Sequence, residues 1–290
     1  MTRHYGWVPK RHDHELLFFS DYVTTGDVVV PTPPTSVDWT SRIPASALGM
    51  LGNDNAGDCV EAATYHALQS LTNDAIVPTA AETLGWYSTL TGYNPNNPNT
   101  DQGTDIPTAL DWWMRNDLPG TNSRLGAYFS VDVNDQAQQA LALELGGVLI
   151  IGFNCPTSAE TQYDNGQEWV PVRHSPIAGG HSITVDEIDT LKGTGITWGK
   201  YQTFSWPFWQ QYVSESYVLF AEDWVTPSGT APNGILWSVM NSDIQSLYGT
   251  PGPFTDPGGN TPPINPPTTY TPEQAIVAIQ SILTSTSTNG

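Results

Sequence analysis

Hydrophobic and polar positions predict helices in the first half of the chain. In residues 59–71, CVEAATYHALQSL, apolar side chains recur at helical spacing, and Asp58 stands where it would cap the helix. Residues 80–92 predict a second helix. Residues 106–118 predict a third, with Pro107 in its first turn.

After about residue 125 the pattern changes to short strands joined by helices. A helix leads into a buried strand, two alternating segments predict a hairpin, and a short helix precedes a last strand. These segments are, in order, 133–146, 147–154, 181–189 with 195–206, 206–213 and 217–224. Helices followed by strands predict an α+β protein with a helical half and an antiparallel β half.

Composition shifts divide the chain into three parts. They are an N-terminal arm, residues 1–36, a body, residues 37–245, and a tail, residues 246–290. The body is expected to have its helical half at about 37–125 and its β half at about 126–245. The tail is a Pro/Gly-rich linker followed by a helix at 271–285. The apolar face of that helix predicts a contact with the body or with a neighbouring subunit.

The charge excludes some functions. Nine basic against 29 acidic residues give a net charge of −20 over 290 residues. Such a chain repels nucleic-acid phosphates and anionic membrane surfaces. The longest apolar run, residues 148–153, is too short for a membrane span, and residues 1–15 lack the apolar stretch of a secretory signal. We therefore expect a cytoplasmic or virion-associated protein that binds neither nucleic acid nor membranes.

The two cysteines have different expected roles. Cys59 opens a predicted helix after a Gly-containing loop, and a helix N-terminus lowers a thiol's pKa. The other interpretation of Cys59 is a small buried hydrophobe, and the Asp58 carboxylate disfavours a thiolate. Cys155 ends a predicted strand and is interpreted as structural. No Cys or His pair has zinc-ligand spacing and the HDH at 12–14 lies in a polar segment, so we predict no metal and no cofactor.

A thiol nucleophile needs a base, and His181 is the first candidate. It follows two glycines and opens an alternating strand, so it can face a cleft while its strand is anchored. His66, in the Cys59 helix, and His174, in a loop, are the rivals.

Several motifs, taken in order, resemble the papain-like cysteine peptidases, in the divergent form found in bacterial and bacteriophage genomes. They are GWVPKRHDHE (6–15), SVDWT (36–40), NDNAGDC (53–59), GTDIPTALDWWMRNDL (103–118), GGHSITVDEID (179–189), TWG (197–199) and Tyr217. The resemblance implies a papain-like α+β fold with an active-site cleft between the two halves. It also implies that the N-terminal arm could lie across the cleft as a pro-segment does, although packing on the outside is equally open.

The resemblance assigns roles to four residues. Cys59 falls on the nucleophile, His181 on the catalytic histidine, and Asn53 on the glutamine that helps bind the oxyanion. The family's third residue, an asparagine, maps to Ile196 or Thr197, and of these only the Thr197 hydroxyl could hold the imidazole. We therefore expect Thr197, or a water that it holds, to contact His181, with Trp198 shielding the contact from solvent.

Two departures from the family pattern stand beside the nucleophile. Val60 replaces the usual aromatic residue, and Asp58 replaces a small one. The implied function is a cysteine hydrolase acting on a peptide, a protein or another amide, with transglutaminase-like or acyltransferase chemistry as a lesser option. The alternative is a weakly active or inactive structural or binding protein of the same fold, such as a bacteriophage virion component that contacts its partner through the tail.

Overall fold

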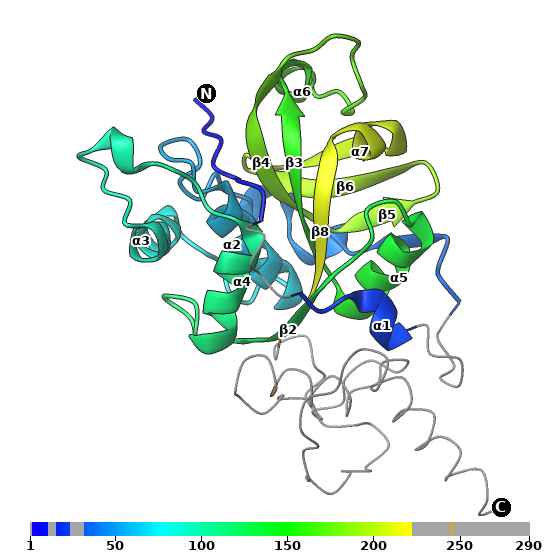
Figure 1. The fold of residues 1–290 in the computed structure, drawn as a ribbon, viewed down its shortest axis with the longest axis horizontal. Coiled ribbons are helices and arrows are strands. Elements are labelled where there is room, and N and C mark those ends of the chain that lie inside the picture. Colours follow the sequence, from blue (N-terminus) through cyan, green and yellow to red (C-terminus); the bar gives the residue numbers. More distant parts are fainter. Residues whose placement is uncertain (1, 11–15, 24–31, 222–244, 246–290) are drawn as a thin grey trace, which may run out of the picture. The chain divides into compact units, whose positions relative to one another are not determined.

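A computed structural model describes residues 2–10, 16–23, 32–221 and 245 (Figure 1). The chain divides into two compact units, one of residues 1–19 and 32–224 and the other of residues 20–31 and 225–290. The predicted linker, the helix at 271–285 and the tail's partner contact lie outside the described residues. Within the described part, no helix is long and apolar enough to cross a membrane.

The first part of the described chain is mainly helical, and the second part is rich in β-strands. The helices are α1 (Phe19–Val23), η1 (Thr40–Arg42), η2 (Ala45–Ala47), α2 (Cys59–Leu71), α3 (Ala80–Thr91), η3 (Pro98–Thr100), α4 (Ile106–Arg115), α5 (Gln136–Gly146), α6 (Thr157–Asp164) and α7 (Trp206–Tyr212). The strands are β1 (Ser36–Asp38), β2 (Leu125–Ser130), β3 (Leu149–Pro156), β4 (Ile177–Val185), β5 (Glu187–Asp189), β6 (Lys192–Thr197), β7 (Lys200–Ser205) and β8 (Val213–Ala221). The α+β prediction is confirmed.

Helix α2 forms the centre of the helical part and begins at Cys59, as predicted. All 13 of its residues are buried, which explains why its pattern is apolar and alanine-rich rather than strongly one-sided. The prediction that Asp58 caps the helix is wrong, because its side chain makes no capping hydrogen bond. Both carboxylate oxygens are instead buried without a hydrogen-bond partner.

The β part contains two four-stranded sheets, with strand orders β1-β5-β6-β7 and β2-β8-β3-β4. Strand β3 carries the predicted apolar run and pairs antiparallel with both β8 and β4. This pairing sets Phe153 of β3 directly opposite His181 of β4. His181 is therefore held in the middle of a paired strand rather than on a loose connection.

The hairpin predicted from residues 181–189 and 195–206 is confirmed in part. Strand β5, at the end of the first segment, pairs antiparallel with β6. The second segment is itself split into β6 and β7, which pair with each other around a tight turn. Trp198 and Gly199 form that turn with φ angles of 46° and 77°. Positive φ at two successive residues reverses the chain, so Thr197 ends β6 and Trp198 projects from the turn.

Candidate active site

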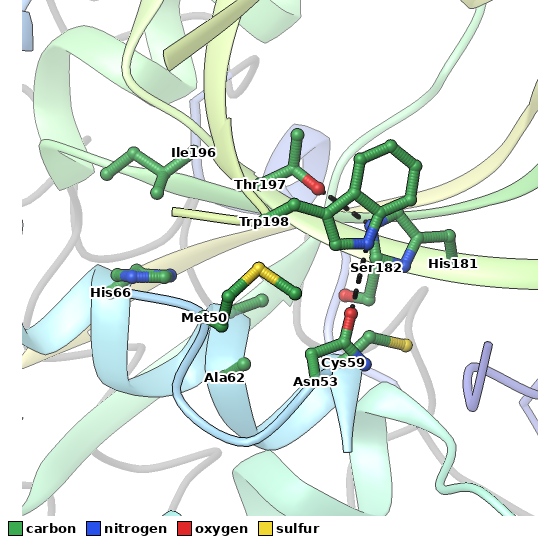
Figure 2. A pocket seen from close by; sticks show the side chains of 11 residues that line it. Met50, Asn53, Cys59, Ala62, His66, His181, Ser182, Ile196, Thr197 and Trp198 are labelled. Carbon is green, nitrogen blue, oxygen red and sulfur yellow. Dashed lines mark hydrogen bonds between the residues drawn. The ribbon is translucent and has the colours of Figure 1, made fainter. Parts of the chain in front are cut away.

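Cys59 and His181 lie on the walls of one small pocket between the helical part and the β part (Figure 2). Cys59 comes from the first turn of α2, and His181 comes from β4. Loop residue Asn53 and the end of β6 with its turn, Thr197 and Trp198, complete the group. The four residues assigned from the sequence are therefore brought together.

His181 is oriented from two sides. Its Nε2 atom lies 2.8 Å from the Thr197 hydroxyl oxygen. The Trp198 indole stacks on the imidazole, with ring centres 4.7 Å apart and planes 20° from parallel. The expected contact with Thr197 and its cover by Trp198 are confirmed. The other ring nitrogen, Nδ1, has no hydrogen-bond partner, so the ring makes no hydrogen bond to Cys59 in this conformation.

The side-chain amide of Asn53 is fully used. Its nitrogen donates to the carbonyl oxygens of His4, at 3.0 Å, and of Ala56, at 3.1 Å. Its oxygen accepts a hydrogen bond of 3.1 Å from the indole nitrogen of Trp198. Asn53 thus holds the tryptophan that covers His181, and neither of its amide hydrogens is directed at an incoming carbonyl.

Cys59 and His181 are both held in their neutral forms. Burial raises the pKa of the Cys59 thiol to about 12. The backbone N–H groups of Ser182 and Gly6 have the opposite, smaller effect on this pKa. The nearby carboxyl groups of Glu61 and Asp58 raise this pKa further. For His181, burial and then the positive charge of Arg3 lower the pKa to about 3. A thiolate–imidazolium pair is therefore not formed at neutral pH in this conformation.

An N-terminal segment, residues 3–8, runs between the helical part and the β part (Figure 1). On the helical side, the His4 N–H donates to the Asn53 carbonyl at 3.0 Å, and the Thr104 N–H donates to the Gly6 carbonyl at 2.8 Å. On the β side, the Trp7 N–H donates to the carbonyl of Gly180, beside His181, at 3.1 Å. The segment is bonded to both walls as an extra strand would be.

Side chains of this segment pack over His181 and Trp198. The Tyr5 ring meets His181 edge-on at 5.9 Å, and its hydroxyl donates to Glu160 at 2.6 Å. The Arg3 guanidinium lies 4.5 Å from the centre of the Trp198 ring and forms an ion pair with Asp164.

Gly6 is required at its position. A side chain there would collide with the carbonyl oxygen of Gly57, two residues before Cys59. From the sequence, the N-terminal arm could either cross the cleft or pack outside it, and residues 3–8 take the first course. A glycine followed by tryptophan at 6–7 was the signal, because a close backbone approach needs glycine and a buried indole anchors a chain.

The other histidine and cysteine candidates, His66, His174 and Cys155, make no hydrogen bond to the imidazole of His181. His66 lines the same pocket from α2, its Nε2 has no hydrogen-bond partner, and burial lowers its pKa to about 4. His174 is exposed in a loop. Cys155 is buried, and both cysteines are free thiols. Within the described ranges, no group of three His, Cys, Asp or Glu side chains could hold a metal ion.

Comparison with known proteins gives matches in structure only. No family model and no curated sequence matches the chain. Xylellain, a cysteine protease from Xylella fastidiosa, aligns with a TM-score of 0.57 and 15% identity, over 76% of this chain and 96% of that one. The cysteine protease and lectin-like domains of Cwp84, a surface-layer-associated protein of Clostridium difficile, align with a TM-score of 0.51 and 11% identity, over 75% of this chain and 55% of that one. The chain therefore has the papain-like fold of cysteine proteases.

Proposed function

We propose that the protein is a cysteine hydrolase that cleaves peptide bonds or related amides, with Cys59 as nucleophile and His181 as base. The observation that carries the proposal is the state of the His181 ring. Thr197 holds Nε2, and Nδ1 is left unpaired in the pocket that also holds Cys59. A base held at one nitrogen and free at the other is the arrangement that nucleophile activation requires.

This arrangement defines the proton transfers. With the hydrogen on Nε2 donated to the Thr197 hydroxyl oxygen, Nδ1 has a lone pair to accept the thiol proton of Cys59. The thiolate attacks the substrate carbonyl carbon, and the imidazolium returns the proton to the leaving amine as the C–N bond breaks. A water then gives a proton to His181 and attacks the thioester, which releases a carboxylic acid and restores the Cys59 thiol.

Asn53 has a part that depends on the N-terminal segment. While residues 3–8 lie in the cleft, one amide hydrogen of Asn53 is donated to the His4 carbonyl oxygen. When residues 3–8 leave the cleft, that hydrogen becomes available to a tetrahedral oxyanion, together with the backbone N–H of Cys59 at the start of α2. The His4 carbonyl thus occupies a donor that the reaction would use.

Displacement of residues 3–8 is accordingly a condition for activity. Removing them rehydrates the pocket and takes the Arg3 charge away from His181. Both changes raise the pKa of the imidazole, and hydration lowers the pKa of the Cys59 thiol. The N-terminal segment therefore serves as a pro-segment-like plug in the proposed enzyme.

The alternative function, an inactive binding protein with this fold, is not favoured. An inactive protein has no need to hold a histidine ring by a hydroxyl, a stacked indole and an asparagine that fixes the indole. Such a network costs side-chain entropy and buries polar groups.

The experiment uses a substitution that displaces residues 3–8 from the cleft without removing a side chain from the hydrophobic core. Gly6→Leu puts a side chain where the Gly57 carbonyl leaves no room, whereas Gly85→Ala, on α3 with nothing within 4 Å, is the matched control. We expect Gly6→Leu to hydrolyse a fluorogenic peptide library faster than the wild type and Gly85→Ala do. Adding Cys59→Ala or His181→Ala should abolish that activity. Hydrolysis that persists in the Cys59→Ala double variant would refute the assignment.

A further inference from the structure

Trp7 is the anchor of the N-terminal segment. Its side chain is only 4% exposed. Its backbone forms a parallel bridge with Thr104 on the helical side, and its N–H bonds to Gly180 on the β side. The indole nitrogen donates a hydrogen bond of 2.6 Å to a carboxylate oxygen of Glu215, which is itself buried. The indole therefore occupies a well-formed, buried pocket that has a carboxylate at one end.

A row of residues across three strands forms the floor of this pocket, which we name the Trp7 pocket. Glu215 of β8 pairs with Gly152 of β3, and Gly152 pairs with Ser182 of β4. A side chain at Gly152 would collide with the indole nitrogen of Trp7. A Cβ at Gly180 would lie 2.8 Å from the Cε3 atom of the indole. Two glycines thus leave a space that fits a side chain of tryptophan size.

The Trp7 pocket adjoins the reacting atoms. The backbone N–H of Gly6, one residue before Trp7, is close enough to Cys59 to lower the pKa of its thiol. The two pocket residues Gly180 and Ser182 flank His181 in the sequence. A chain that replaced residues 3–8 along the same path over Cys59 would direct one side chain into this space.

The charge in the pocket selects the occupant. Glu215 accepts hydrogen bonds from the Trp7 indole and, at 2.6 Å, from the Tyr217 hydroxyl. Burial raises the pKa of Glu215, and the nearby carboxylate of Asp105 adds to this while Lys10 opposes it. When the indole leaves, one carboxylate oxygen loses its donor in a buried, negatively charged place. An occupant without an N–H donor leaves that oxygen unsatisfied, which is costly.

We propose that the Trp7 pocket is the substrate-specificity pocket and that it takes a large side chain ending in an N–H donor, tryptophan or arginine. This inference rests on the proposed function, because it needs residues 3–8 to give way to a substrate. The pocket rejects acidic side chains, which would face Glu215, and gains little from small ones, which leave the space between Gly152 and Gly180 unfilled.

The test measures covalent labelling of Cys59 in full-length Trp7→Ala. The probes are acyloxymethyl ketones on two-residue peptides, in which each position is varied in turn through Trp, Arg, Ala and Glu. Labelling rates come from intact mass and the site from peptide mapping. At one of the two positions we expect Trp and Arg to label at least about tenfold faster than Ala or Glu, the effect of a satisfied hydrogen bond to a buried charge.

A second substitution separates charge from size. Adding Glu215→Gln should lower the Arg-to-Ala rate ratio by about tenfold, because the amide has no charge to match the guanidinium. Glu160→Gln, which removes a carboxylate that holds Tyr5 outside the pocket, should leave that ratio unchanged. If circular dichroism shows that Trp7→Ala does not fold, the same ratios are measured in Gly6→Leu.

The outcomes distinguish the two proposals. Equal labelling of Cys59 by all four probes, at both positions, would refute the specificity pocket and leave the hydrolase proposal standing. No labelling of Cys59 by any probe in a folded variant would refute the hydrolase proposal itself. A ratio that Glu215→Gln does not change would remove Glu215 from the selection and overturn the inference.

Discussion

Glu61 should make the protein less stable as the pH rises. Its side chain is fully buried in α2, two residues after Cys59. One carboxylate oxygen accepts a hydrogen bond of 2.7 Å from the Thr104 hydroxyl, and the other has no partner. Burial raises the pKa of Glu61 from 4.5 to about 7, opposed by the Thr104 hydrogen bond and its own backbone N–H and assisted by the Asp101 and Asp105 carboxylates.

The sign and the size of the effect follow from this pKa. Between pH 4.5 and 7 the native state keeps a proton that the unfolded chain has released, so the free energy of unfolding falls as the pH rises. A shift from 4.5 to about 7 corresponds to about 3 kcal/mol, since one pKa unit is ~1.4 kcal/mol. Glu61→Gln keeps the size of the side chain and removes the ionisation.

Urea unfolding at pH 5 and pH 8 measures the effect. The stability of Glu61→Gln relative to wild type should increase by about 2–3 kcal/mol between these two pH values, because only the wild type ionises at this site. Glu168→Gln, at an exposed position, should show no such change. If the relative stability of Glu61→Gln is the same at both pH values, Glu61 does not carry the buried proton assigned to it.

Three further predictions concern the base, the plug and the core. In the Gly6→Leu background, Thr197→Val should lower kcat/KM about ten- to a hundredfold by freeing the His181 ring, and Thr197→Asn should restore it; an unchanged kcat/KM in both would mean that another group orients the ring. Tyr5→Phe removes the hydrogen bond to Glu160 and should speed labelling of Cys59 by iodoacetamide up to about tenfold, with no change counting against the plug. Trp113→Ala, at a fully buried side chain of α4, should cost about 3–5 kcal/mol of stability in urea, and a cost below about 1 kcal/mol would contradict its place in the core.

Local sequence patterns predicted the elements that hold Cys59 and His181. Helix α2 begins at Cys59 because a Gly/Asn/Asp loop ends there and an apolar, helix-forming run follows. The strand of His181 was predicted from alternation after two glycines, although β4 begins four residues earlier, at Ile177. Gly179 and Gly180 do not contribute to an apolar/polar alternation, so the pattern does not place them in the strand. The absence of a side chain at these two positions lets Tyr5 and Trp7 approach the strand.

Long-range contacts account for what local patterns missed. Asp58 has the residue type of a helix cap, yet its carboxyl group is buried, where desolvation raises its pKa well above the usual range. Asn53 was expected to offer its amide to an oxyanion, but the His4 carbonyl, 49 residues away, takes it. The turn at Trp198 has a positive φ at a bulky residue, and long-range contacts such as its packing on His181 and its bond to Asn53 hold it there. None of these contacts is encoded within a short window of sequence.

The pH profile of Cys59 labelling distinguishes a paired nucleophile covered by residues 3–8 from an ordinary buried thiol. The measurement compares the rate of iodoacetamide reaction at Cys59 in folded Gly6→Leu and Gly85→Ala between pH 5 and pH 9. We expect Gly6→Leu to react rapidly and almost independently of pH from pH 5 to 7, and His181→Ala to remove this reactivity. Gly85→Ala should react slowly at pH 7 and faster only toward alkaline pH, as burial of the thiol requires. A Gly6→Leu protein that stays folded but labels only at alkaline pH, like an ordinary thiol, would contradict the account of a paired nucleophile covered by residues 3–8.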